Sequence, residues 1–332
     1  MRIRIGLGVT GESARLLSTQ ELNRYVVKAE EHGFESVWIA EDYYYRNVFF
    51  SLALLALATD KIKLATGIIN PFTRDPALIA MTFANLDEIS KKRAIIGLGS
   101  SLRLRIYEHH FREVKQLTAM KECIEIIREL LTGKKVTYKG NVFQTQNLRL
   151  GAKLLRESIP IYVGAMGPKM LQLAGEIADG VLLTAGATAE YIKFAVKNIE
   201  IGANRAGRKL EDVDVASYVI FSALKDPETA REITKDEIAF LITLSAMDNV
   251  LKASGLLGTE NVRIIRRFGQ KGEMSKAAEY VSEDLINALA VCGKPEECLE
   301  KLEELRSSGL NLPVIVPMGK GSMRITLDLF EE

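Results

Sequence analysis

Two adjacent acidic residues, Glu41 and Asp42, follow a short apolar run and are candidates for proton transfer. The run, residues 36–40, has the length and composition of a buried strand. In barrels of parallel strands, the residues just after each strand line the end where ligands bind. Either carboxyl could therefore act as an acid–base group or contact a cofactor edge. The same residues could instead cap a helix or pair with a cation, which would serve only the fold.

Glycine-rich turns follow two further apolar runs, at residues 62–69 and 94–98. Glycine allows unusual backbone angles and lets a flat ligand approach the main chain closely. A helix start at Asp75-Pro76 lies between the two runs, so they belong to one strand–helix–strand unit. The residues expected to contact a ligand here are Gly67, Ile68, Ile69, Asn70, Gly97, Gly99, Ser100 and Ser101.

A third loop has the composition of an anion-binding turn. It follows the apolar run 159–163, and a helix is expected from about Pro168 to Ala178. Backbone N–H groups at a helix start attract anions, and a lysine adds positive charge. The alternative is an ordinary strand–helix turn. The residues concerned are Gly164, Ala165, Met166, Gly167, Pro168 and Lys169.

These loops need a frame of parallel strands. Eight candidate strands, centred near residues 3, 38, 65, 96, 162, 182, 217 and 315, alternate mostly with helical segments. This rhythm predicts an α/β protein with a (β/α)8 TIM barrel. The segment Gly6-Leu7-Gly8-Val9-Thr10-Gly11 matches the dinucleotide-binding fingerprint, but the next helix signal comes only at Ser18-Thr19-Gln20-Glu21. A strand followed by a loop is therefore the favoured interpretation.

Two stretches interrupt the rhythm. Residues 134–150 alternate apolar and polar positions around Lys139-Gly140-Asn141, which predicts a β-hairpin insertion. Residues 226–280 are rich in helix formers and predict helical insertions before the last barrel strand. No segment has the composition of a linker, so we expect one TIM-barrel domain over residues 1–332.

Bulk composition excludes several classes of protein. Of the 332 residues, 47% are hydrophobic and the net charge is +1, which favours a large core and argues against nucleic-acid partners or an acidic membrane surface. The longest apolar run, residues 49–59, is too short to span a bilayer, and the first residues are too short an apolar run for a signal peptide. Three cysteines without a CxxC pair, Cys123, Cys292 and Cys298, fit a reducing cytoplasm.

The chain resembles the bacterial-luciferase-like barrel superfamily through the segments EEHGFESVWIAED, ATGIINPFTRDPALIAM, NLDEIS and YVGAMGPKMLQLAGEIADGVLL. Within that superfamily it is most similar to the methylenetetrahydromethanopterin reductases, which use the deazaflavin coenzyme F420. The similarity covers nearly the whole chain, including the C-terminal segment AVCGKPEECLEKLEELRSSG.

The resemblance implies a position for the cofactor. The family has a non-proline cis peptide in a bulge after its third strand, and the matching bond here is Gly67–Ile68. The loop that holds the phosphate of the cofactor tail matches Gly164 to Lys169. Contacts to the ring edge would come from Glu41, Asn70 and the loop Gly97–Ser101.

The chain departs from the reductase pattern at three places, and these affect residues expected to take part in the reaction more than residues that form the fold. Gly8 stands where the family has a proton-donating glutamate in the first strand. Glu41-Asp42 stands where the reductases usually have Asp-His, and Ser100-Ser101-Leu102 replaces their Gly-Asp-Lys. With Gly8 in the usual donor's place, the catalytic acid would be Glu41 or Asp42.

The main functional hypothesis is an F420-dependent oxidoreductase that acts on CH–NH bonds and transfers hydride between the reduced deazaflavin and a methylene-pterin. One alternative is an FMN-dependent monooxygenase of the same barrel. Another is an F420-binding relative that has a different substrate or none. A small pterin-like substrate and a homodimer or homotetramer are the expected partners, with no bound metal.

Overall fold

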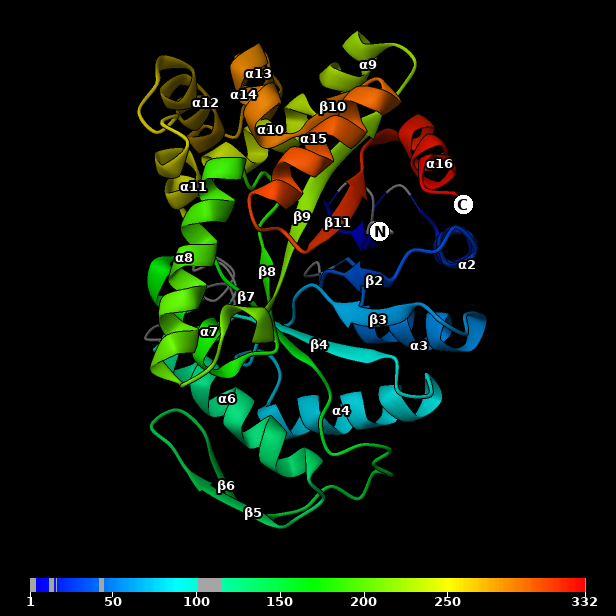
Figure 1. Cartoon of the computed structure of the whole chain (residues 1–332), viewed down its shortest axis with the longest axis vertical. Coiled ribbons are helices and arrows are strands. Elements are labelled where there is room, and N and C mark those ends of the chain that lie inside the picture. Colours follow the sequence, from blue (N-terminus) through cyan, green and yellow to red (C-terminus); the bar gives the residue numbers. More distant parts are fainter. Residues whose placement is uncertain (1–3, 12–14, 16, 42–44, 101–114, 332) are drawn as a thin grey trace.

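Eight parallel strands form a closed barrel in the computed structural model, which describes residues 4–11, 15, 17–41, 45–100 and 115–331 (Figure 1). Each strand pairs with the next around the ring, and β1 closes on β11 while β8 pairs with β9. The predicted TIM barrel is confirmed. The strands are β1 (Gly6–Val9), β2 (Ser36–Ile39), β3 (Lys63–Thr66), β4 (Ala94–Gly99), β7 (Ile161–Gly164), β8 (Gly180–Leu183), β9 (Asp214–Ala223) and β11 (Leu312–Pro317).

Helices follow these strands and cover the outside of the barrel (Figure 1). Their starts agree with the sequence signals. Ser18 and Glu21 form the predicted capping box of the first helix, and Asp75 accepts the N–H of Ala77 at the start of the third. The helices are α2 (Thr19–Glu31), α3 (Val48–Ala58), α4 (Pro76–Ile89), α6 (Gln116–Leu131), α7 (Pro168–Ile177), α8 (Ala189–Arg205), α15 (Pro295–Ser307) and α16 (Gly319–Leu329). No helix in the described part of the chain is both long and apolar enough to cross a bilayer.

Two groups of elements lie between the barrel units. A hairpin of β5 (Val136–Lys139) and β6 (Gln144–Leu148) packs beside α6. A helical region between β9 and β11 contains α9 (Pro227–Glu232), α10 (Lys235–Thr243), α11 (Asp248–Ala253), α12 (Glu260–Gln270), α13 (Met274–Ala278) and α14 (Glu283–Leu289). The short strand β10 (Val291–Gly293), which pairs with β9, was not predicted. The first strand also lies later than its predicted centre near residue 3.

The carboxylate of Glu122, from α6, fastens the tip of the hairpin. It accepts the backbone N–H groups of Asn141, Val142 and Phe143 at 2.7–2.9 Å. Burial alone would raise the pKa of Glu122, but these three hydrogen bonds outweigh that effect and lower it. The hairpin is therefore held to the barrel by an ionised side chain beneath its turn.

A network of charged side chains closes the base of the barrel, at the N-terminal ends of the strands. Arg4 donates to Glu35 at 2.7 Å and to Asp214 at 2.9 Å. Lys63 donates to Glu35 at 2.8 Å, and the Tyr162 hydroxyl donates to Asp214 at 2.7 Å. Burial alone would raise the pKa of Glu35, but its hydrogen bonds to the two cations lower it to about 2.

Candidate active site

The turn after β3 lies at the mouth of the barrel, where the C-terminal ends of the strands meet. The Gly67–Ile68 peptide bond is cis, as predicted. The half-buried Ile68 side chain lies against two glycines at neighbouring strand ends. A Cβ atom built on Gly99 would be 2.7 Å from Ile68, and one built on Gly164 would be 3.1 Å from it. The structure therefore brings together residues from three of the predicted ligand-binding segments.

Two of the predicted contact residues also have structural roles. Gly97 lies so close to β3 that an added Cβ would be 1.7 Å from the carbonyl oxygen of Thr66. Position 97 therefore requires glycine for the fold itself. The side-chain oxygen of Asn70 accepts the N–H groups of Phe72 and Thr73 at 2.9 and 3.0 Å. Asn70 thus shapes the loop after β3, and its contact with a ligand stays a prediction.

The loop between β7 and α7 has the predicted form, a strand followed by a helix start. Gly167 is the N-cap of α7 and Pro168 its first residue, and among the described residues no side chain caps this end. The Met166 carbonyl accepts the hydroxyl of Tyr191 at 2.8 Å, which holds the loop from α8. Lys169 is exposed. A helix start of this kind, with uncapped N–H groups and a lysine, suits an anion.

Glu41 has a cation partner. Its carboxylate accepts the Nε–H of Arg74 at 3.0 Å and a second N–H from the same guanidinium. The Arg74 guanidinium also lies 4.6 Å from the centre of the Phe49 ring, and only 10% of the Glu41 side chain is exposed. The structure thus gives Glu41 the ion-pair role that the sequence left open, while its part in proton transfer stays a prediction. Asp42 and Ser101 lie outside the described residues.

Tyr218, from β9, was not among the predicted site residues. Its hydroxyl crosses the barrel interior and donates to the Gly67 carbonyl oxygen at 2.7 Å. Its ring occupies the space beside Gly8, where an added Cβ would be 3.0 Å from the ring and 2.7 Å from Val316. The only sequence signal for this contact was Gly8, because a glycine inside a buried strand often marks a place where another group approaches closely.

Comparison with protein families gives a match to the family described as luciferase-like monooxygenase over residues 2–312. This match runs from before β1 to the first residue of β11. The chain belongs to the luciferase-like family. The resemblance noted from the sequence is therefore confirmed at the level of the family.

Relatives of this luciferase-like chain include enzymes of known activity. It is 37% identical to a 5,10-methylenetetrahydromethanopterin reductase of Archaeoglobus fulgidus, with 87% of each chain covered. It is 39% identical to the enzyme of that name from Methanopyrus kandleri, with 86% of each covered. The solved structure of the coenzyme F420-dependent tetrahydromethanopterin reductase from M. kandleri superposes with a TM-score of 0.89 at 35% identity, covering 99% of this chain and 97% of that one.

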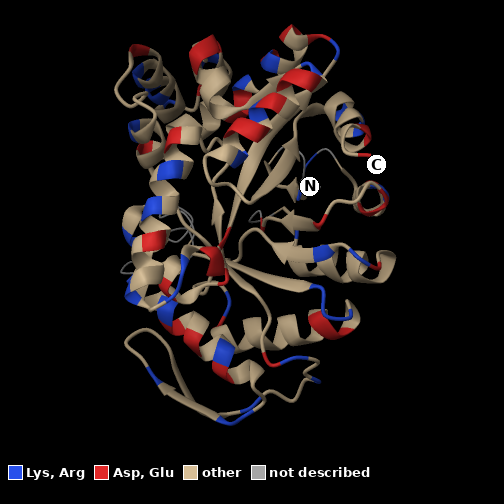
Figure 2. Ribbon diagram, viewed as in Figure 1, with Lys and Arg blue, Asp and Glu red and all other residues tan. Residues whose placement is uncertain are grey.

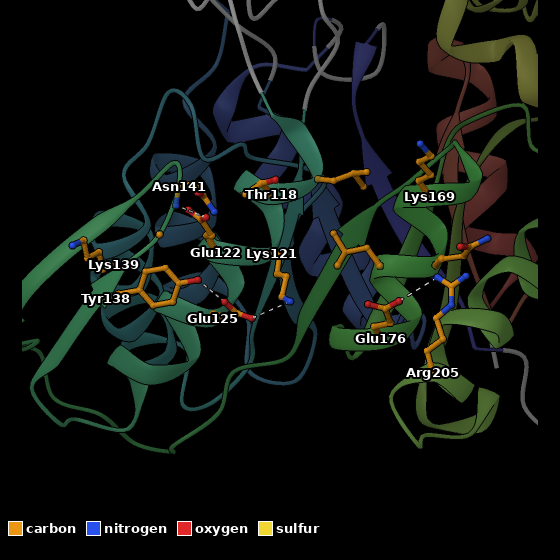
Figure 3. Close-up of a pocket in the computed structure, with 14 residues that line it drawn as sticks. Thr118, Lys121, Glu122, Glu125, Tyr138, Lys139, Asn141, Lys169, Glu176 and Arg205 are labelled. Carbon is orange, nitrogen blue, oxygen red and sulfur yellow. Dashed lines mark hydrogen bonds and ion pairs between the residues drawn. The ribbon is translucent and has the colours of Figure 1, made fainter.

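The luciferase-like barrel also carries a groove on its outer surface, between α6, α7 and the hairpin (Figure 3). Its volume is about 720 Å³, and Lys169 lies on its wall. Two of its acidic side chains have partners on the wall itself, because Glu125 accepts the Tyr138 hydroxyl and Glu176 pairs with Arg205 at 3.4 Å. The groove is separate from the Ile68 turn.

Proposed function

We propose that the protein is a coenzyme F420-dependent oxidoreductase that transfers hydride between reduced F420 and a methylene-pterin, as a 5,10-methylenetetrahydromethanopterin reductase does. The observation that carries the proposal is the meeting of Ile68, Gly99 and Gly164 at the barrel mouth, in a chain whose relatives over most of its length have that name. An apolar side chain with glycines beside it suits the face of a flat ring.

The residues at the mouth fit the two parts of such a cofactor. Ile68, Gly99 and Gly164 would contact the ring, and the start of α7 at Gly167 and Lys169 would hold the phosphate of the tail. When bound in its reduced form, the cofactor supplies the hydride. The chain supplies the surface that orients the ring and the electrostatics of the tail site. Further ring-edge contacts are assigned to Ile69, Asn70, Gly97 and Ser100, and further tail contacts to Ala165, Met166 and Pro168.

Proton transfer is assigned to the acidic pair after β2. Opening a methylene bridge between two nitrogens requires a proton at one of them as the hydride arrives at carbon. Glu41 is held in place by two hydrogen bonds from Arg74, and we assign it the part of a relay that takes up a proton from solvent and releases it to the pterin nitrogen. Asp42, its neighbour in the chain, is the second candidate.

Cofactor titration tests this proposal directly. Purified protein is titrated separately with coenzyme F420 and with FMN, and binding is followed by absorbance and fluorescence. Turnover is then measured with methylene-tetrahydromethanopterin. Tight binding of F420 with turnover supports the reductase. Binding of FMN alone would favour the monooxygenase, and F420 binding without pterin turnover would favour a relative with another substrate.

We also propose that a second copy of the chain covers the outer face of α3. This helix contains no charged residue (Figure 2). Its Phe50 and Leu57 are 77% and 78% exposed. Leu54 lies on the same face, and Leu78 and Met81 are exposed on α4, which packs against α3. An uncharged apolar face of this kind is complementary to itself, which favours a two-fold homodimer, or a homotetramer built from it. Leu57→Glu should shift the mass measured by light scattering to that of a monomer.

A cytoplasmic location is the last part of the proposal. All three cysteines are free thiols, and Cys123 and Cys298 are buried. Proteins of oxidising compartments usually pair such residues. Fractionation of the source cells, with the protein detected by antibody, tests the assignment.

A further inference from the structure

We propose that Tyr218 is a positioning residue for the reaction, because its hydroxyl fixes the turn that presents Ile68 to the cofactor ring. This inference rests on the proposed function. The hydroxyl is the only part of Tyr218 that the reaction would require, since a phenylalanine ring fills the same space.

The phenol reaches across the barrel from β9 to the turn after β3, which lies opposite β9 in the ring of strands. Its hydroxyl donates to the Gly67 carbonyl at 2.7 Å, and a Cβ built on Gly67 would be only 1.9 Å from that oxygen. The ring lies against Gly8 of β1, and just 8% of Tyr218 is exposed. Tyr218 is therefore unable to turn away while the barrel is intact.

The Gly67 carbonyl and the Ile68 nitrogen belong to the same peptide group, so an anchor on the carbonyl also places the start of Ile68. The Ile68 side chain then lies across Gly99 and Gly164, at the proposed ring site. On the other side of the turn, the Ile69 N–H donates to the Gly97 carbonyl at 3.0 Å, and Gly99 donates to the Ile69 carbonyl at 2.9 Å. The turn is thus held from both sides, by β4 and by Tyr218.

The barrel contains a matched control for this hydrogen bond. Tyr162 is 7% exposed, and its hydroxyl also donates at 2.7 Å, but to Asp214 at the base. Tyr218→Phe and Tyr162→Phe each remove one buried hydroxyl and leave a ring of the same shape. Only the first removes a contact to the proposed cofactor turn.

The experiment compares wild type with both variants in melting temperature, F420 affinity, the absorbance spectrum of bound F420, kcat and KM. Tyr218→Phe is expected to lower kcat about tenfold and to shift the bound spectrum, with the KM for the pterin changed less than twofold, because misplacement of a bound reactant reduces turnover. Tyr162→Phe should lower the melting temperature by at least as much and leave kcat and the spectrum unchanged.

Equal kcat in the two variants, at similar loss of thermal stability, would overturn the inference. An unchanged bound spectrum in Tyr218→Phe would overturn it as well. Failure of the wild type to bind F420 would instead overturn the proposed function, because it would be seen before any variant is compared.

Discussion

The two ends of this barrel differ in the groups that hold them together at the centre. At the base, the side chains of Arg4, Glu35, Lys63 and Asp214 satisfy one another through ion pairs. At the mouth, the turn around Ile68 is held by backbone hydrogen bonds, by close contacts with glycines and by the Tyr218 hydroxyl, and the Glu41–Arg74 ion pair lies on neighbouring loops. Buried tyrosines follow the same division: Tyr162 at the base donates to a carboxylate, whereas Tyr218 and Tyr191 donate to main-chain carbonyls of loops at the mouth.

This difference indicates that one end of the barrel serves mainly stability and the other mainly ligand binding. Ion pairs at the base join strand ends that are distant in sequence, so they stabilise the closed ring. A ligand site gains from backbone surfaces that a ring can approach closely and whose polar groups need no rearrangement. Variants at the base should therefore change stability, and variants at the mouth should change binding and turnover.

The largest effect is expected at the acidic pair that follows β2. Glu41→Gln or Asp42→Asn should lower turnover about 10²–10⁴-fold, the usual contribution of general acid–base catalysis, with F420 affinity largely unchanged. Arg74→Gln is the matched control, because it breaks the same ion pair and keeps the Glu41 carboxyl. If Arg74→Gln and Glu41→Gln reduce kcat equally, Glu41 acts only by holding Arg74. Full activity in both acid variants would place proton transfer on another group.

Acid is expected to weaken the ion-pair network at the bottom of the barrel. The pKa of Glu35 is about 2 in the folded protein, against an ordinary value of 4.5. Because folding lowers this pKa, the stabilisation is fully present above about pH 4.5 and is lost as the pH falls toward 2. The loss is at most about 3 kcal/mol, since the side chain is partly exposed. Urea unfolding at pH 6 and pH 3 measures it, and an unchanged free energy of unfolding would contradict the assignment.

Replacement of Arg4 tests the ion-pair network at the bottom of the barrel without a change of pH. Arg4→Met leaves Glu35 and Asp214 facing each other with less compensation, and should cost about 2–3 kcal/mol, below the value for a fully buried pair because Arg4 is partly exposed. The kcat at a temperature where the variant is folded should equal that of wild type. A fall in kcat as large as that caused by a mouth variant would show that the two ends are not separable.

The smallest effect is expected at the tail loop. Gly167→Leu should weaken F420 binding about tenfold or more, because a side chain blocks approach to the N–H groups of α7. The fold should be unaffected, since φ is −96° and an added Cβ would be 3.7 Å from Asn249. Gly151→Leu, with open space around its Cβ, is the control. Isothermal titration measures both, and equal affinities would place the tail elsewhere.

Local patterns in the sequence were enough to predict the barrel. Short apolar runs marked the eight strands, and helix caps such as Ser18 and Asp75 marked where helices begin. Because parallel strands place their C-terminal ends together, the meeting of Ile68, Gly99 and Gly164 followed from the fold alone.

Contacts between side chains from different parts of the barrel could not be predicted from such local patterns. The pairing of Glu41 with Arg74 depends on how two loops pack, and neither residue indicates the other in sequence. The hydrogen bond from Tyr218 to Gly67 joins residues 151 positions apart, through an interior whose side chains fit by volume. Strand β10 was missed because three residues before a helix carry no periodic signal.

The hairpin anchor has a consequence for engineering. Glu122 accepts hydrogen bonds from the main-chain N–H groups of Asn141, Val142 and Phe143 at the hairpin tip. Every residue except proline offers the same backbone donor. The side chains of Asn141 and Val142 are exposed, whereas Phe143 packs against the core. Positions 141 and 142 can therefore accept other side chains, such as a cysteine for labelling, at a fixed position on the surface while the barrel mouth keeps its geometry.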